Sequence, residues 1–196
     1  MTTDIFINAR CTWSPSAESN APALPWVPVL FKRRLSTLSR MVIHAVHAVS
    51  DNRPPVKITF SSVYGEVSQQ WKIAKKIIET GEVSPAHFSL SVFNTPAALS
   101  TILEKNTTGY AAVFSGAQAF ETGLQDAIAD LETSGESERI YVYADEILPE
   151  DYQKLTKSET PSFVLALRLS KTKSPESIPC PRQKMPALSF LKSILL

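Results

Sequence analysis

The sequence predicts an α/β fold, in which strands and helices alternate along a single chain. Short apolar runs rich in β-branched and aromatic residues predict the strands. Longer segments with apolar residues three or four positions apart predict the helices. Prolines gather at residues 15–28 and 175–186 and leave the alternation between them intact. Such an order is typical of a mainly parallel sheet covered by helices on both faces.

The first half of the chain contains two predicted strands and three predicted helices. A strand is expected over residues 4–13, followed by a long helix that opens with FKRRLSTLSRM and ends before Pro54-Pro55. VKITFSSV predicts the second strand. The next helix runs over about residues 66–80, with Gly81 at its C-terminal cap. Its side chains expected to point inward are Val67, Trp71, Ala74, Ile77 and Ile78. Asn94-Thr95-Pro96 marks the start of another helix.

The second half contains a strand over 110–115, a helix over 118–132 and a strand over 139–144. A short acidic helix or loop precedes SFVLALRLS, which predicts the last strand. Because no long helical crossover separates the last two strands, we expect the final one to be an antiparallel edge strand. Residues 1–174 are expected to form one domain and 175–196 a proline-containing C-terminal tail.

Composition excludes several classes of function. The chain has 20 basic and 19 acidic residues, so no charge excess favours nucleic acid or an anionic membrane. No apolar run approaches the roughly 20 residues of a spanning helix, and DIFINA is too short for a signal peptide. The two cysteines, Cys11 and Cys180, suit neither a disulfide scaffold nor a zinc site. We therefore expect a soluble cytoplasmic protein.

The stretch YAAVFSGAQAFETGL, residues 110–124, is where chemistry is best sought. A buried strand that turns at a glycine into a helix presents the first helical residue to a cleft. That residue is Gln118, whose amide is neither a nucleophile nor a general base. Gln118 either caps the helix, fills a polar pocket, or marks a site that has lost its chemistry. Ser115 is the nearest hydroxyl, but its surroundings lack the G-x-S-x-G pattern.

Other candidate groups carry weaker signals. His44 and His47 have a helical spacing that suits a metal, but no nearby carboxylate or cysteine completes a ligand set, so no metal is expected. The absence of glycine-rich phosphate loops argues against nucleotide cofactors, and no cofactor is expected. The cations at the opening of the first long helix are either a solvated face or a docking site for a carrier protein or acidic partner. These cations are Lys32, Arg33, Arg34 and Arg40.

Four segments together resemble a known family: FSSVYGEV, SPAHFSLSVFNTPAALSTI, YAAVFSGAQAFETGL and RIYVYADEILPEDY. They resemble β-ketoacyl synthase-like N-terminal domain proteins of the chain-length-factor type, which occur with bacterial aryl-polyene synthesis. The resemblance runs from DIFINARCTWSP to PALSFLKSILL, nearly the whole chain. It implies the first half of a thiolase-like fold, a five-stranded mixed sheet with its last strand antiparallel and helices on both faces.

The resemblance implies that the chain is not an enzyme on its own. In active synthases of this family a cysteine nucleophile begins the third, buried helix, and that position falls at Gln118 here. The bulky Phe120 stands where active synthases keep small residues, and the second half with its catalytic histidines is missing from these 196 residues. Self-sufficient condensation is therefore not expected.

The resemblance also implies a partner and a task. The third strand lies at a sheet edge in this fold and is expected to pair with a catalytic ketosynthase subunit, which makes a heterodimer. Its residues are Tyr110, Ala111, Ala112, Val113, Phe114 and Ser115. The segment FSLSVFNT is expected to close the partner's acyl tunnel and limit chain length during polyene elongation on an acyl carrier protein. The gate residues are Phe88, Leu90, Phe93 and Thr95.

Three alternatives stay open. The chain is either a chain-length factor, a stand-alone acyl-thioester hydrolase or transferase that uses Ser115, or a purely structural subunit that stabilises a synthase. A homodimer through the same edge strand is also possible, but it would contain no condensing nucleophile. Product length and the identity of the partner lie beyond the sequence.

Overall fold

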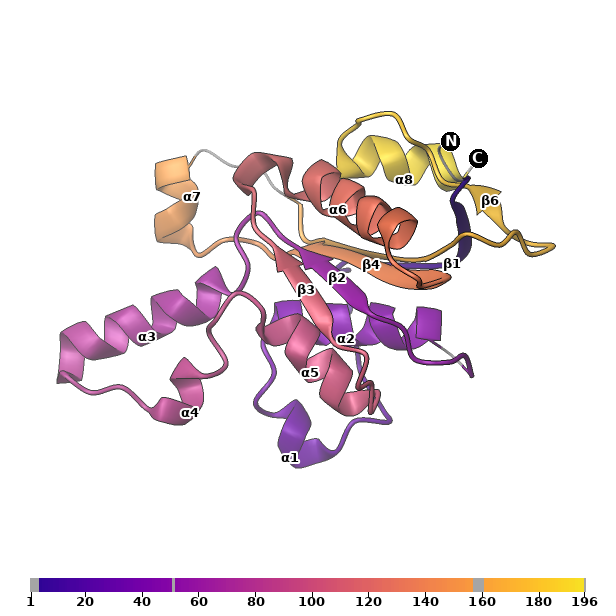
Figure 1. Ribbon diagram of the computed structural model, residues 1–196. Coiled ribbons are helices and arrows are strands. Elements are labelled where there is room, and N and C mark those ends of the chain that lie inside the picture. Colours follow the sequence, from indigo (N-terminus) through magenta and orange to yellow (C-terminus); the bar gives the residue numbers. More distant parts are fainter. Residues whose placement is uncertain (1–3, 51, 157–160, 196) are drawn as a thin grey trace.

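A single mixed sheet organises the computed structural model, which describes residues 4–50, 52–156 and 161–195. Its six strands lie in the order β3-β2-β4-β5-β1-β6 (Figure 1). The strands are β1 (Phe6–Trp13), β2 (Ile58–Ser61), β3 (Tyr110–Val113), β4 (Glu138–Asp145), β5 (Phe163–Ser170) and β6 (Ile178–Pro179). The predicted α/β class is confirmed, with the two-residue β6 added to the five expected strands.

The direction of β5 agrees with the prediction, but its position does not. β5 runs antiparallel to β4, as the short connection required. It is not an edge strand, however, because it also pairs antiparallel with β1 and so lies inside the sheet. All eight residues of β5 are buried. A continuous apolar run of this kind needs cover on both faces and neighbours on both sides, which an edge position does not give.

Helices cover both faces of the sheet (Figure 1). On one face lie α2 (Thr37–Ser50) and α5 (Thr95–Leu103), with the short α1 (Val29–Lys32) beyond them. On the other face lie α6 (Ala119–Thr133) and α8 (Ala187–Leu195). Two separate clusters of buried apolar side chains fill the two interfaces, as burial of a sheet between helix layers requires.

The first long helix begins later than the sequence indicated. Lys32 ends α1, and Arg33 and Arg34 lie in the connection before α2 starts at Thr37. Of the four predicted cations only Arg40 belongs to α2. Arg33 and Arg34 therefore lie outside the first turn of α2. Ser36, whose Oγ accepts a hydrogen bond from the Ser39 amide at 2.8 Å, caps α2 instead.

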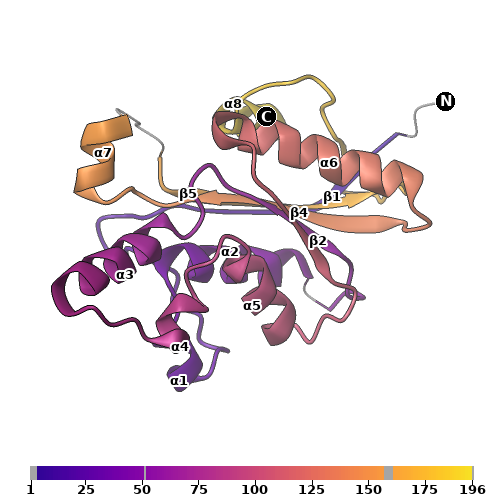
Figure 2. The same ribbon diagram turned by 60° about the vertical axis from the view of Figure 1, so that its left-hand side comes forward.

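The helix α3 (Val67–Thr80) projects from the body together with the short α4 (Pro85–Phe88), as Figure 2 shows. Gly81 has a φ of +72° at its C-terminus, which confirms the predicted glycine cap. The predicted inward face is confirmed for Val67, which is buried, but not for the far end of the helix. Ile77 is 45% exposed and Ile78 is 81% exposed. These two side chains form an exposed apolar end of the helix.

The C-terminal segment returns to the body. β6 pairs with β1, and the Cys180 amide donates to the Ile5 carbonyl at 2.8 Å. Phe190 of α8 is fully buried and lies against Phe120 of α6, with ring centroids 5.3 Å apart. The helix α7 (Glu150–Thr156) lies between β4 and β5 in the chain. In the part of the chain that the structure describes, every helix is too short or too polar to cross a membrane.

Candidate functional site

The predicted elbow lies between β3 and α6. After Val113 the chain turns at Gly116. Its φ of +57° would be strained for an L residue, whereas glycine adopts it readily. A single 3₁₀ turn, η1 (Gly116–Gln118), then leads into α6. Gln118 is exposed and makes no side-chain hydrogen bond that caps α6. The capping reading of Gln118 is therefore wrong, and its amide faces solvent in the isolated chain.

Close packing holds the start of α6 against the sheet. A Cβ atom added to Gly123 would lie 2.6 Å from Ser61 Oγ, so only glycine allows this approach. Tyr141 Oη donates to the Phe120 carbonyl at 2.7 Å and lies 2.8 Å from Ser61 Oγ. Burial raises the pKa of Tyr141 well above its usual value, so the phenol stays neutral. These contacts fix the position of the elbow relative to β2 and β4.

Ser115 lacks the partners that a nucleophile needs. Its Oγ atom is buried and forms no hydrogen bond within the described chain. His47 is occupied elsewhere, since its Nδ1 lies 2.8 Å from Glu104 Oε1 and its ring stacks on Trp26. No described group of three or more His, Cys, Asp or Glu side chains could hold a metal ion. A base within hydrogen-bond reach is required to activate a serine, and Ser115 has none in this geometry.

The loop after β2 is held by a buried carboxylate. Asp145, at the end of β4, accepts hydrogen bonds from Ser62 Oγ at 2.7 Å and from the amides of Val63 and Tyr64. Burial raises the pKa of Asp145, and the hydrogen bond from Tyr143 opposes this rise. The bonds align the carboxyl ends of β2 and β4 next to the elbow.

The strand β3 forms one edge of the sheet, as predicted. It pairs in parallel with β2 on one side, and no described strand pairs with its other side. Ala112 is exposed, and Phe114, just after the strand, is 67% exposed. An open edge with an exposed aromatic side chain is a template for pairing with another chain.

The four predicted gate residues occupy different environments. Phe88 ends α4 and is 57% exposed, and Leu90 is half-buried. Phe93 instead packs into the chain, 5.4 Å from the Phe60 ring and 5.3 Å from the Phe114 ring. Thr95 is buried at the start of α5. The structure thus separates an outer pair, Phe88 and Leu90, from an inner pair, Phe93 and Thr95.

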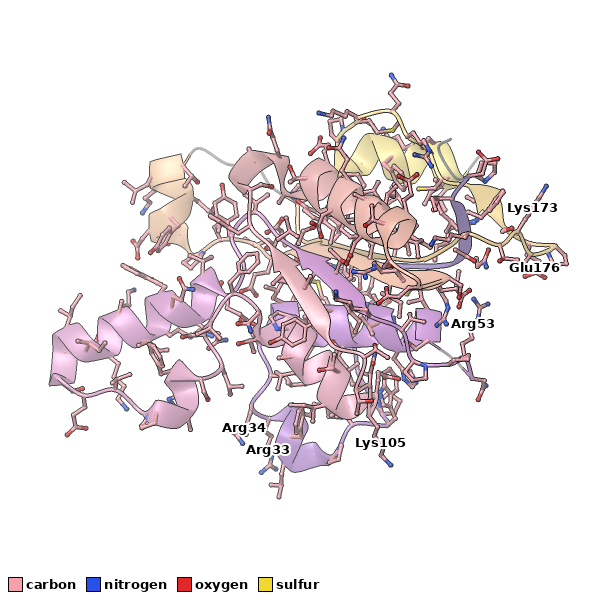
Figure 3. All side chains as sticks on the ribbon, viewed as in Figure 1. Arg33, Arg34, Arg53, Lys105, Lys173 and Glu176 are labelled. Carbon is pink, nitrogen blue, oxygen red and sulfur yellow. The ribbon has the colours of Figure 1, made fainter. Side chains whose placement is uncertain are left out.

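The four predicted docking cations also fall into two groups, one bound to a loop and one exposed. Lys32 Nζ donates to the carbonyls of Ala23 and Leu24, and Arg40 donates twice to the Pro22 carbonyl. These two side chains hold the proline-rich loop before α1. Arg33 and Arg34 are exposed beside α1, as Figure 3 shows.

Two features of this region could not be predicted from the sequence with the patterns used above. Gly65 has a φ of +58°, and a Cβ atom there would lie 2.5 Å from the Phe93 ring, so this glycine makes room for Phe93. Ile102 of α5 is 63% exposed, and α5 packs beside β3. The glycine after a predicted strand was the available signal for the first. Nothing in the sequence distinguishes Ile102 from a core isoleucine.

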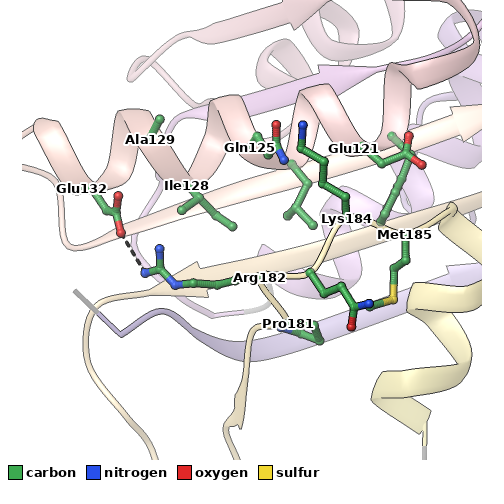
Figure 4. A pocket seen from close by; sticks show the side chains of 12 residues that line it. Glu121, Gln125, Ile128, Ala129, Glu132, Pro181, Arg182, Lys184 and Met185 are labelled. Atoms are coloured by element: carbon green, nitrogen blue, oxygen red, sulfur yellow. Dashed lines mark hydrogen bonds and ion pairs between the residues drawn. The ribbon is translucent and has the colours of Figure 1, made fainter. Parts of the chain in front are cut away.

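A separate groove lies along α6, where this helix faces the C-terminal segment. A cavity of about 180 Å³ lies between α6 and residues 181–185 (Figure 4). Arg182 bridges it by an ion pair with Glu132 at 2.7 Å. This contact joins the C-terminal segment to α6, so the groove belongs to the attachment of α8.

One protein-family model matches most of the chain. Residues 8–189 match the model described as "Beta-ketoacyl synthase, N-terminal domain". No curated protein sequence matches the chain significantly.

Solved structures share its fold. One is the complex of a ketosynthase (ApeO) with its chain length factor (ApeC) from Xenorhabdus doucetiae, with a TM-score of 0.75 and 22% identity over 87% of this chain and 80% of that one. A second is a type II PKS acyl-carrier protein in complex with its ketosynthase (AntDE:AntF), with a TM-score of 0.71 and 12% identity over 87% of this chain and 64% of that one. A third is the ishigamide ketosynthase/chain length factor, with a TM-score of 0.62 and 10% identity over 91% of this chain and 64% of that one.

Proposed function

This chain belongs to the β-ketoacyl synthase N-terminal domain family, and on that premise we propose that it is a non-catalytic chain-length factor. It pairs with a catalytic ketosynthase and shapes the acyl tunnel of that partner during carrier-bound polyene elongation in the cytoplasm. The observation that carries the proposal is the open edge of β3 directly beside the gate segment. Phe114 on that edge and Phe93 in that segment are in ring contact.

The partner is a ketosynthase because its fold provides a matching edge. Two of the similar solved structures are ketosynthases with chain length factors, which supports this choice of partner. A strand of the same kind can extend the sheet beyond β3 and cover its unpaired backbone groups. Phe114 then becomes buried at the centre of the contact, where aromatic side chains contribute most to binding.

The residue at the elbow supports a non-catalytic role. Gln118 stands at the elbow where the family resemblance places the synthase cysteine, and an amide does not ionise to attack a thioester. The exposed position of Gln118 suits a surface that faces the partner's tunnel. The partner's own cysteine then carries out the condensation.

The gate acts through two layers of side chains. Phe88 and Leu90 are accessible from outside and meet the growing chain first. Phe93 closes the tunnel from within, because Phe60 behind it prevents it from withdrawing. A wall of large side chains stops elongation, since forcing one more methylene into a packed space costs on the order of 1–3 kcal/mol.

The acyl carrier protein docks on Arg33 and Arg34. These two exposed guanidinium groups suit an acidic partner surface, whereas Lys32 and Arg40 already bind loop carbonyls. Replacing both arginines by glutamine is expected to slow elongation by the pair without changing product length.

Product length tests the gate directly. The chain is co-expressed with a ketosynthase and its carrier protein, and the polyene products are measured by mass spectrometry. We expect Phe88→Ala, Leu90→Ala and Phe93→Ala to lengthen the products, with Phe93→Ala having the largest effect. Leu155→Ala, at an 80% exposed apolar position on α7, is the matched control and leaves the length unchanged. Unchanged length in all three gate variants, with an intact complex, would instead favour a purely structural subunit.

A further inference from the structure

The gate segment, residues 88–95, is attached to both ends of the edge strand β3. Asn94 Nδ2 donates a hydrogen bond to Tyr110 Oη at 2.7 Å, and Tyr110 is the first residue of β3. The ring of Phe93 contacts the ring of Phe114, which directly follows the strand. Two neighbouring residues of the gate segment therefore bind the two ends of the strand that is open for pairing.

The helix α3 holds the same segment from another side. Gln70 Nε2 donates to the carbonyl of Ser91 at 3.0 Å. Ser91 is buried, and its own Oγ donates to the Phe88 carbonyl at 2.8 Å. The segment has little regular structure between α4 and α5, so these side-chain contacts define its position relative to the sheet.

Gly65 determines how deeply Phe93 can sit. Gly65 is buried in the loop after β2, and its φ is +58°. A Cβ atom at this position would lie 2.5 Å from Cδ2 and 3.1 Å from Cε2 of the Phe93 ring. The ring thus occupies the space that any larger residue at position 65 would need. On the core side it meets Phe60, which is fully buried.

We propose that Gly65 and Tyr110 are positioning residues that determine product length, an inference that rests on the proposed function. Each acts through the gate segment: Gly65 admits the Phe93 ring, and Tyr110 holds Asn94. Because Tyr110 and Phe114 belong to the edge that pairs with the ketosynthase, pairing also fixes the distance from Phe93 to the partner's tunnel. Product length therefore depends on residues that do not touch the acyl chain.

Gly65→Ala should shift the product distribution toward shorter chains, the opposite of Phe93→Ala. The new methyl group displaces the Phe93 ring, and buried Phe60 prevents a movement toward the core. Phe114 is exposed, so the ring moves toward the surface and reaches further into the tunnel. In a Phe93→Ala background, Gly65→Ala has no ring to displace and should leave the longer products unchanged.

Gly81→Ala is the matched control for backbone strain. Gly81 has a φ of +72°, but nothing lies within 4 Å of a Cβ atom there. An alanine at either glycine adopts an unfavourable left-handed conformation, whereas only the one at position 65 meets a ring. Gly81→Ala should therefore lose stability without changing product length.

Tyr110→Phe removes the hydroxyl group and keeps the ring, so the edge strand can still pair. Asn94 then loses its hydrogen bond, the gate segment becomes less fixed, and the product distribution should become broader while the complex stays intact. Asn94→Ala should have the same effect, because the Asn94 side chain makes no hydrogen bond that caps α5. Tyr152→Phe on α7 is the control for the hydroxyl deletion.

The geometry can be tested in the isolated chain, without any product. Tyr110→Phe and Asn94→Ala should each lower the folding equilibrium constant by about fivefold in urea unfolding. The double variant should lose no more than either single variant, because the two groups share one hydrogen bond. Amides of residues 91–95 should exchange hydrogen faster in both single variants, while those of α6 are unaffected. Additive losses of stability, or unchanged exchange, would overturn the role of Tyr110.

Product length tests the inference as a whole. Each variant is co-expressed with a ketosynthase and its carrier protein, the complex is checked by size-exclusion chromatography, and the polyenes are measured by mass spectrometry. Shorter products from Gly65→Ala and a broader distribution from Tyr110→Phe, with both controls unchanged, are the expected result. Longer products from Phe93→Ala with no effect of Gly65→Ala and Tyr110→Phe would overturn the inference and leave the proposed function intact. No effect of any variant, Phe93→Ala included, would overturn both.

Discussion

Phe93 and Phe114 meet edge to face, with their ring centroids 5.3 Å apart and their planes at 79°. The two residues come from different parts of the structure. Phe93 belongs to the segment before α5, and Phe114 follows the edge strand β3. Phe93 also contacts Phe60 on β2, so the three rings form one row from the core to the surface. A partner that buries Phe114 therefore acts on the position of Phe93.

Phe114→Glu should prevent assembly with a ketosynthase without unfolding the chain. The side chain is 67% exposed, so its replacement is expected to change the free energy of unfolding by less than about 0.5 kcal/mol. A carboxylate buried in a sheet-to-sheet contact has no partner, which should abolish co-purification. Leu155→Glu is the matched control, because it adds the same charge at an exposed apolar site on α7. Equal loss of binding in both variants would mean that the charge, and not the site, matters.

Phe93→Ala should destabilise the isolated chain by about 2 kcal/mol, because Phe93 is half-buried and contacts the Phe60 ring. Phe88→Ala removes a ring that is 57% exposed and should change stability by less than about 0.5 kcal/mol. Urea unfolding of the two variants side by side measures the difference. Equal stability would show that Phe93 is not held against the core.

Gly123→Ala should destabilise the fold by about 1–3 kcal/mol or more, because the new Cβ would lie 2.6 Å from Ser61 and 3.0 Å from Tyr141. Gly135→Ala is the control, since nothing lies within 4 Å of a Cβ atom at that position. Thermal unfolding of both variants checks this. A neutral Gly123→Ala would contradict the close packing of α6 on β2 and β4.

Gln118→Cys should produce a reactive surface thiol but no condensing enzyme. Gln118 is exposed, so the cysteine is accessible to an alkylating reagent. Cys180 provides the internal comparison, because burial raises the pKa of its thiol to about 12. Condensation of malonyl and acyl carrier proteins by the purified variant alone, above the level of the wild type, would show that the chain retains more catalytic machinery than proposed.

The sequence predicted the order of the elements better than their surroundings. Apolar periodicity is a local property, so it located α6 and β4 to within a few residues. The antiparallel direction of β5 followed from the length of one connection, but its interior position depends on β1, which is far away in the chain. Local patterns do not contain that information.

The same limit explains the errors about α3 and the cations. Periodicity predicts that α3 is an amphipathic helix, but not whether another element covers Ile77 and Ile78. The break between α1 and α2 depends on Ser36, whose hydroxyl caps α2 and bonds Glu66. The burial of Glu66 itself could not be predicted, because glutamate is rarely enclosed and the enclosing residues come from α2 and β4.

The proposed function depends on the pairing of the edge strand β3 with a ketosynthase. Its most direct test is co-expression with candidate ketosynthase subunits from the same cell, followed by size-exclusion chromatography with mass determination. We expect a stable one-to-one heterodimer that Phe114→Glu dissociates. A well-behaved monomer that binds no ketosynthase would contradict it.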